Sequence, residues 1–212
     1  DSALALHRAL KEGHEVKCLV TVLPQREDSW MFHYPNIHLT PLFAESTGIP
    51  LVRGETTGMK ETELEDLKRL LAALNIEGVV SGAISSRYQK SGIDRICREL
   101  SLESIAPLWG EDPKRLLMEM IDLGFEVIVV GVYAYGFDQG WLGRKIDQTA
   151  VNDLTELNKR YQISLVGEGG EYETLVLDAP FFRKRMQLIE TEKVWEGQSG
   201  CLLVKRAALI SK

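Results

Sequence analysis

Apolar runs that alternate with helical segments constrain the fold of this chain more than any other feature of its sequence. Residues 16–23 (VKCLVTVL) are almost continuously apolar and are closed by Pro24, a pattern typical of a strand buried on both faces of a parallel sheet. We predict further strands at 49–52, 76–84 and 125–132. Because helical segments separate these strands, the sequence predicts an α/β protein with a doubly wound parallel sheet.

The segments between the strands carry the apolar spacing of helices that cover a sheet. The clearest is 60–75, where leucines recur along one stripe and acidic residues occupy the first turn, near the positive end of the helix dipole. Asp112 followed by Pro113 is a typical helix start, and Gly124 is a typical stop. Further helices are expected at 2–12, 40–47 and 149–161, and around Ile93, Ile96 and Leu100.

The pattern of predicted secondary structure changes after Tyr161. Short β-prone runs follow, separated by glycine and charge, at 163–166, 175–177, 186–189 and 201–204. Strands without intervening helices indicate a smaller C-terminal α+β lobe. We therefore predict two domains, residues 1–105 and 106–212, with a boundary near 104–111.

Charge and residue usage exclude several classes of protein. Lys and Arg number 25 against 31 Asp and Glu, a net charge of -6, which argues against direct binding of nucleic acid. No apolar run approaches the ~20 residues that cross a bilayer, so we expect no membrane association and a cytoplasmic protein. The cysteines and histidines lack the spacings of metal or redox motifs.

Two segments of the predicted parallel-sheet half carry residue types that packing alone does not require. A helix that starts at Asp1 and Ser2 presents backbone N–H groups and a positive dipole end, which suit phosphate, although Asp-Ser is also an ordinary N-cap. Residues 81–89 (SGAISSRYQ) place small residues where a buried strand ends, so a ligand could approach the backbone there. A plain turn capped by Ser85 or Ser86 is the alternative.

A third segment, residues 167–174 (GEGGEYET), holds three carboxylates and three glycines between two apolar runs. Like charges so close together are costly unless water screens them or donors and cations satisfy them. One explanation is a solvated hairpin with Gly169-Gly170 as its turn. The other is a tightly folded loop whose carboxylates converge on a cation, a metal or a set of N–H donors.

Taken together, these segments resemble one family. Residues 167–180 (GEGGEYETLVLDAP) are similar to the signature of the diphthine-ammonia ligases, a branch of the N-type ATP pyrophosphatases. Residues 81–89 resemble the family's second motif, 106–113 (APLWGEDP) resemble a third, and 29–33 (SWMFH) more distantly resemble a block after the second strand. The resemblance extends through nearly the whole chain in the same order.

The resemblance implies a Rossmann-like fold of the adenine nucleotide alpha hydrolase type. Family members open with a strand and a Ser-Gly-Gly-Lys-Asp-Ser loop, and this sequence starts at the last two residues of such a loop, so we expect further residues before Asp1. The family amidates the carboxylate of diphthine, a modified histidine of translation elongation factor 2, with ammonium. ATP is cleaved to AMP and pyrophosphate through an acyl-adenylate, and the product is diphthamide.

On this pattern we assign roles to the matching residues. The expected ATP-binding residues are Asp1, Ser2, His33, Gly82 and Ala83, with Asp1 also holding Mg²⁺ indirectly. The expected substrate-binding residues are Tyr88, Gln89, Gly169, Gly170, Glu171, Tyr172 and Glu173. The catalytic candidates are Asp1, Glu168 and Glu171, and one of the two glutamates would deprotonate ammonium.

Diphthine carries a quaternary ammonium, and we hypothesise that the acidic loop attracts it. The glutamates at 168, 171 and 173 would supply negative charge, and an aromatic ring would lie against the cation. The candidate rings are Tyr133, Tyr135, Trp141 and Tyr172.

The expected reaction requires the amino end of the first helix and the acidic loop to face one another across a shared crevice. Two other functions stay open, namely an ATP pyrophosphatase that modifies tRNA and a nucleotide-binding module without catalysis. Whether the protein forms a homo-oligomer is also left open.

Overall fold

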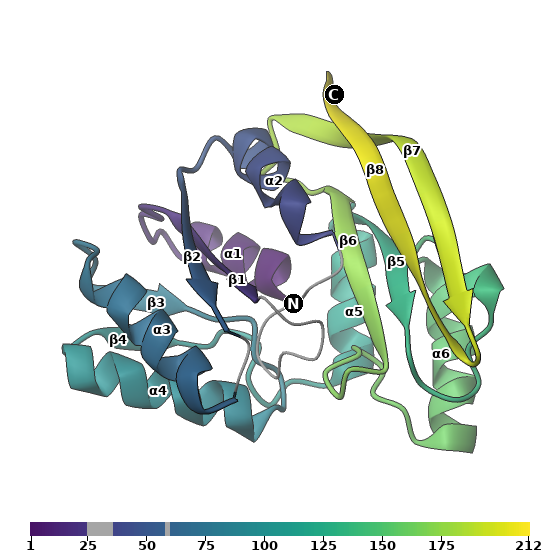
Figure 1. Ribbon diagram of the computed structural model, residues 1–212, viewed down its shortest axis with the longest axis horizontal. Coiled ribbons are helices and arrows are strands. Elements are labelled where there is room, and N and C mark those ends of the chain that lie inside the picture. Colours follow the sequence, from purple (N-terminus) through teal and green to yellow (C-terminus); the bar gives the residue numbers. More distant parts are fainter. Residues whose placement is uncertain (25–35, 58–59) are drawn as a thin grey trace. The chain divides into compact units, whose positions relative to one another are not determined.

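The structure of this chain, a computed structural model, describes residues 1–24, 36–57 and 60–212. The chain forms two compact units, Asp1–Trp109 and Gly110–Lys212. Figure 1 shows the helices and strands of both. Among the helices in these ranges, none has the length and apolar character needed to span a lipid bilayer.

The first unit alternates helices with short parallel strands. Its elements are α1 (Ser2–Lys11), β1 (Leu19–Pro24), the 3₁₀ turn η1 (Ile37–Leu39), α2 (Thr40–Thr47), β2 (Leu51–Thr56), α3 (Lys60–Ala72), β3 (Gly78–Val80), α4 (Arg87–Leu100) and β4 (Glu103–Ile105). β1 pairs with β2 and β3 pairs with β4, both in parallel. The predicted mixed α/β class is therefore confirmed. The doubly wound order stays a prediction, because the strands are joined as two separate pairs.

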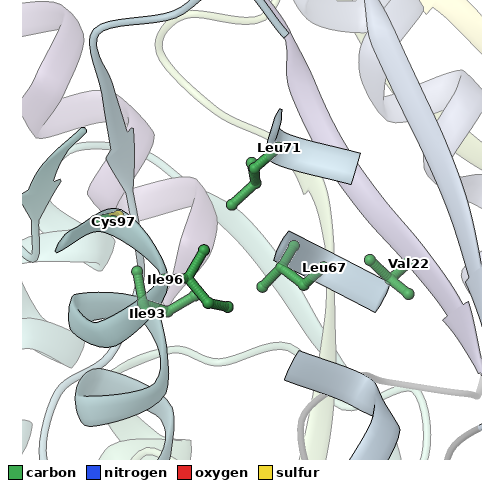
Figure 2. Close-up of a cluster of buried hydrophobic side chains, with 6 residues drawn as sticks. All are labelled: Val22, Leu67, Leu71, Ile93, Ile96 and Cys97. Atoms are coloured by element: carbon green, nitrogen blue, oxygen red, sulfur yellow. The ribbon is translucent and has the colours of Figure 1, made fainter. Parts of the chain in front are cut away.

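The core of the first unit lies where β1, α3 and α4 meet. Figure 2 shows the buried side chains that form it: Val22, Leu67, Leu71, Ile93, Ile96 and Cys97. Burial of an aliphatic side chain stabilises the fold by about 1.5–3 kcal/mol, so this cluster fixes α3 and α4 against the strand. The predicted stripe on α3 is confirmed. The helix ends at Ala72, before the predicted end, because the amides of Ala73 and Leu74 turn back to carbonyls three residues earlier.

The second unit is built on an antiparallel sheet. Its elements are α5 (Pro113–Asp122), β5 (Glu126–Val132), the 3₁₀ turn η2 (Gln139–Trp141), α6 (Gln148–Tyr161), β6 (Tyr172–Asp178), β7 (Lys184–Glu196) and β8 (Ser199–Ser211). The strand order is β6-β5-β8-β7, and in the view of Figure 1 α5 and α6 run behind this sheet. The Asp112 carboxylate caps α5 by accepting a hydrogen bond of 2.8 Å from the Arg115 amide, which confirms the predicted helix start.

Two strand predictions are corrected by the structure, and one of the two explanations offered for the acidic segment is excluded. The strand expected at 76–84 is only Gly78–Val80, since Ser81 donates its amide to Ile105 and the chain then turns toward α4. The segment 163–166 is not a strand, because the Ser164 hydroxyl accepts the amides of Val166 and Glu168, 3.3 Å away in each case. The acidic segment is not a hairpin, because it joins α6 to β6, which pairs with β5.

Candidate active site

The start of α1 lies directly against Gly82, in the loop between β3 and α4. A Cβ atom on Gly82 would come within 2.6 Å of the Ser2 backbone nitrogen and 2.8 Å of the Asp1 carbonyl carbon. Separations this short leave room for glycine alone. The structure thus brings together Asp1, Ser2 and Gly82, three of the residues expected to bind ATP.

The first helix is held firmly in place around this contact. Six of its residues are buried, namely Ala3, Leu4, Ala5, Leu6, His7 and Ala9. Asp1 occupies the N-cap position and its carbonyl accepts the Ala5 amide at 2.9 Å, yet in the described part of the chain its carboxylate makes no capping hydrogen bond to the helix. The helix terminus therefore keeps its positive dipole end without a side-chain cap from Asp1, an arrangement suited to an anionic ligand.

The loop around Gly82 is fixed at the carboxyl ends of β3 and β4. Ser81 donates its amide to the Ile105 carbonyl at 2.9 Å, and Ala83 is 3% exposed. Arg8 of α1 donates from Nη1 to the Pro107 carbonyl at 2.7 Å. Ligands of open α/β sheets bind outside the carboxyl ends of the strands, and Gly82 and Ala83 follow β3 at that end.

The alternative explanation for this loop, a plain turn with a serine that caps the next helix, also holds in part. The Ser86 hydroxyl accepts the Gln89 amide at 3.4 Å and so caps α4. Tyr88 and Gln89 lie in the first turn of α4 and are half-buried. Capping explains Ser86 and leaves the close approach of Gly82 to Ser2 unexplained, so the two readings account for different residues.

Sequence reasoning missed a polar group beside this loop. Lys90 donates from Nζ to both carboxylate oxygens of Asp94, at 2.7 and 2.9 Å, and the Ser104 hydroxyl donates to Asp94 at 2.6 Å. Lys90 and then Ser104 hold the pKa of Asp94 below its ordinary value. The same ammonium lies 5.6 Å from the ring centroid of Trp109, which is 38% exposed. The four-residue spacing of Lys90 and Asp94 on a helix was the available signal.

The acidic loop of the second unit uses one of its own carboxylates to hold its backbone. Glu171 accepts the Ser164 amide at 2.8 Å through Oε1 and the Gly169 amide at 2.9 Å through Oε2. The sequence allowed a cation, a metal or a set of N–H donors as partners for these carboxylates. For Glu171, the partners in the structure are N–H donors. Because both carboxylate oxygens of Glu171 accept hydrogen bonds from the loop backbone, the expectation that Glu171 acts as a catalytic base is weakened.

Glycine is required at two positions of this loop. Gly167 and Gly170 have φ values of +72° and +81°, in the left-handed region that residues with a side chain rarely adopt. A Cβ on Gly167 would also lie 2.5 Å from the Tyr172 carbonyl oxygen. The Gly170 amide donates to the Gly167 carbonyl at 3.0 Å and closes the turn. Gly169 and Gly170 are exposed, so backbone at the loop tip is accessible.

Tyr172 is a core residue of the second unit. It is 4% exposed, its hydroxyl donates to the Leu165 carbonyl at 2.5 Å, and its ring centroid lies 5.8 Å from that of Phe137. Burial, followed by the charge of Glu171, raises its pKa. A ring enclosed in this way stabilises the unit and is not placed to lie against a cation.

The remaining site predictions have separate outcomes. His33 and the rest of 29–33 lie outside the described residues. Within the described ranges, no three His, Cys, Asp or Glu side chains gather as a metal site would require, so a Mg²⁺ role rests on Asp1 alone. Asp1 and Ser2 belong to the first unit, and Glu168 and Glu173 belong to the second.

Parallel strand pairs whose carboxyl ends meet a glycine-cradled helix terminus are features of α/β proteins that bind nucleotides. The chain belongs to the diphthamide synthase family: residues 1–104 match the diphthamide synthase N-terminal domain and residues 112–210 match the C-terminal domain.

Several similar proteins carry the name diphthine–ammonia ligase. The protein from Rattus norvegicus is 36% identical, and the one from Homo sapiens is 32% identical; each match covers 92% of this chain and 81% of the relative. The protein from Schizosaccharomyces pombe is 35% identical over 100% of this chain, which spans only 38% of that relative.

Proposed function

We propose that this protein amidates the diphthine carboxylate of translation elongation factor 2 with ammonium, at the expense of ATP. The observation that carries the proposal is that the match to diphthine–ammonia ligases extends through both units. The packing of Gly82 on Ser2 supports it, because that contact fixes a helix terminus suited to phosphate. A tRNA-modifying enzyme is disfavoured by the names of the relatives and by the net charge of -6.

The chemistry begins with activation of the carboxylate. A carboxylate oxygen of diphthine attacks the α-phosphorus of ATP, the bond between the α- and β-phosphates breaks, and pyrophosphate leaves. The N–H groups at the start of α1 would bind the leaving phosphates, and Gly82 and Ala83 would lie near the α-phosphate or ribose. Fixed dipoles of this kind stabilise charge in the transition state without having to reorganise.

The second step forms the amide. Ammonium loses a proton, ammonia attacks the acyl carbon of the adenylate, and AMP leaves with the bonding electrons. We assign the proton acceptor to Glu168, because the loop contacts described above engage both oxygens of Glu171. Orientation of the two reactants would account for much of the remaining acceleration.

Mg²⁺ would accompany the nucleotide. Asp1 is exposed at the head of α1, and a carboxylate oxygen is a ligand type that this ion prefers, commonly through retained water. Bound there, the ion would neutralise phosphate charge. In this assignment the first unit binds ATP within a doubly wound nucleotide fold, and Gly169 and Gly170 of the second unit bind the diphthine side chain.

The test is a reconstituted reaction with the intact protein, ATP, Mg²⁺, ammonium chloride and elongation factor 2 that carries diphthine. We expect AMP and diphthamide to form in equal amounts, measured by chromatography and by intact mass. Leaving out ammonium should abolish diphthamide. AMP formation that is independent of the modified factor would refute the proposal, as would ATP binding without any turnover.

A further inference from the structure

Two tyrosines form an exposed aromatic pair on the second unit. Tyr135 follows β5 and Tyr161 ends α6, and their rings meet edge-on with centroids 5.1 Å apart. Tyr135 is 63% exposed and Tyr161 is 41% exposed. The pair rests on the backbone of the loop, because a Cβ atom on Gly136 would lie 2.5 Å from ring carbons of Tyr161. Aromatic rings that are supported in this way and still open to solvent are typical anchors of protein interfaces.

A cavity of about 510 Å³ between η2 and α6 adjoins this pair. Leu157 connects the two features, because it lines the cavity and its Cδ2 atom would lie 3.0 Å from a Cβ atom on Gly136. Arg160, the residue before Tyr161, lines the cavity as well. The exposed rings and the cavity therefore form one continuous surface.

Charges of both signs line this cavity and balance one another. Asp153 accepts a hydrogen bond of 2.5 Å from Nη2 of Arg144, whose guanidinium lies 4.4 Å from the Trp141 ring centroid. Glu156 pairs with Lys159 at 2.7 Å. With Asp138 and Arg160, the cavity wall and its rim carry equal numbers of carboxylates and cations. A surface of this kind has no excess of positive charge to attract a polyanion.

The surface shares its support with the acidic loop. The Tyr172 ring at the end of that loop lies 5.8 Å from the Phe137 ring, and the Phe137 ring lies 5.2 Å from the Trp141 ring, measured between centroids. Trp141 in turn lines the cavity. The Tyr133 amide also donates to the Glu171 carbonyl of the loop at 2.8 Å. A partner bound at the cavity would therefore lie on the same packed support as the loop.

We propose that Tyr135, Tyr161 and the adjoining cavity, here called the tyrosine surface, dock a folded protein partner, which in the proposed reaction is elongation factor 2. Exposed tyrosine beside arginine and tryptophan is the composition of binding hot spots in protein interfaces. Nucleic acid and anionic membranes instead bind surfaces with an excess of positive charge. The inference rests on the proposed function for the name of the partner. The surface alone defines a partner with apolar side chains at the centre of its contact and charges of both signs around them.

The experiment measures Kd of the intact protein for diphthine-bearing elongation factor 2 by biolayer interferometry, without ATP. Tyr135→Ala should weaken binding at least about tenfold, as the loss of an interface hot spot does. Tyr135→Phe should keep most of the affinity, because it retains the ring. Ile189→Ala is the matched control, since Ile189 is 48% exposed on β7 of the same unit, and its Kd should stay within about twofold of the original.

Two further measurements keep the test independent of folding. Arg160→Glu reverses a charge at the cavity without touching the ring pair and should weaken binding about threefold or more, since rim charges act mainly on association. Raising the salt from 50 to 200 mM should change Kd by less than about tenfold, whereas a surface for a polyanion would lose ~10³ or more.

The inference would be overturned by normal binding of folded Tyr135→Ala or by salt dependence of the polyanion size. It would also be overturned if Ile189→Ala weakened binding and Tyr135→Ala did not. Ile189 lines a second cavity, of about 620 Å³, along β7 and β8, and that result would place the partner there.

Amidation of a short peptide that carries diphthine separates docking from chemistry. Tyr135→Ala should raise KM for the intact factor at least several-fold and leave KM for ATP and for the peptide unchanged, because the peptide lacks the docked surface. Equal loss of activity toward factor and peptide would indicate a structural role for Tyr135 and count against docking. Because binding of the factor is measured without ATP, docking can succeed where amidation fails, and amidation can succeed where the Tyr135 variant binds normally.

Discussion

At the start of α1, the backbone of Asp1 and Ser2 packs on Gly82, and the Asp1 carboxylate does not cap the helix within the described residues. In the loop of the second unit, by contrast, the Glu171 carboxylate accepts the amides of Ser164 and Gly169. Both regions combine glycine with an acidic residue. In the first, glycine provides close approach to a helix terminus; in the second, it allows a turn that the protein's own carboxylate closes.

The comparison separates two uses of the same residue types. Backbone amides at a helix start with no side-chain cap suit an external anion. Backbone amides that already bind a carboxylate are satisfied, and the loop they belong to becomes a rigid support for its neighbours. We therefore expect changes in the first region to affect nucleotide binding and changes at Glu171 to affect stability of the second unit.

The largest effect is expected for Gly82→Ala. The added methyl would overlap the backbone of Ser2, and α1 cannot move easily because it is buried on several sides. Such overpacking typically costs about 1–3 kcal/mol, and we expect ATP affinity to fall at least tenfold. Isothermal titration with ATP and thermal unfolding would measure the two quantities.

Gly92→Ala is the matched control. Its new Cβ would meet only the tip of the Leu64 side chain, at 2.7 Å, and it lies within α4, where alanine is favoured over glycine by about 0.5–1 kcal/mol. ATP affinity should stay within twofold of the original protein. An equal loss of affinity in both variants would show that Gly82 has no special relation to the helix terminus.

An intermediate effect is expected for Glu171→Ala. Two hydrogen bonds to a charged acceptor would be lost, and such bonds contribute about 1.5–3 kcal/mol each at most. Because the loop is partly exposed, water would take over part of the lost hydrogen bonding to the two amides. We therefore expect the free energy of unfolding to fall by about 1–3 kcal/mol. Urea unfolding measures it, and amide hydrogen exchange at Ser164 and Gly169 should become faster.

Glu173→Ala provides the contrast in the same segment. It leaves both loop hydrogen bonds of Glu171 in place, so exchange at Ser164 and Gly169 should not change. If both variants accelerate exchange to the same degree, Glu171 has no distinct role in holding the loop.

The smallest effect is expected from the pH dependence of Asp94. Its pKa in the folded protein is lowered by Lys90 and Ser104, whereas an Asp in the unfolded chain has a pKa of about 3.9. Its contribution is therefore present above that value and is lost as the pH falls through the lower, folded pKa. Since the pair is partly exposed, the contribution should be about 1 kcal/mol or less.

Unfolding free energies from pH 7 to pH 2 test this for the original protein and Asp94→Asn. The difference between the two should be largest near neutral pH and should shrink in acid. In a Ser104→Ala background, the stability lost on changing Asp94 to Asn should be only partly smaller, because the ion pair of Asp94 with Lys90 remains. A constant difference across the range would exclude ionisation of Asp94 as its source.

Sequence reasoning succeeded where the controlling interactions are local. The Asp112 cap and the leucine stripe of α3 depend on residues a few positions apart, and the structure confirms both. It failed at 163–166, where the Ser164 hydroxyl competes for the amides that a strand would pair. It also extended β3 too far, because burial of Ala83 and Ile84 arises from loop packing as readily as from a strand.

The sequence was enough to identify the segments of the candidate site, but not to decide which residue in them has which role. The residues 81–89 and 167–174 were identified by their small and acidic side chains. The choice among Tyr133, Tyr135, Trp141 and Tyr172 was not, because period and residue type do not show that Trp141 and Tyr172 are buried while Tyr133 and Tyr135 are exposed. The position of Tyr172 on the core face follows from its register with Val132.

The sequence alone determined the alternation of helices and strands, the helix starts and the two glycine-rich segments, because these depend on side-chain type and short-range spacing. Only the tertiary structure decided that Gly82 touches Ser2, that Glu171 turns back onto its own loop, and that Tyr133 rests on Gly131. Each of those contacts depends on where the backbone passes relative to another segment. Strand register and core packing set those paths, and neither is encoded in the spacing of one segment.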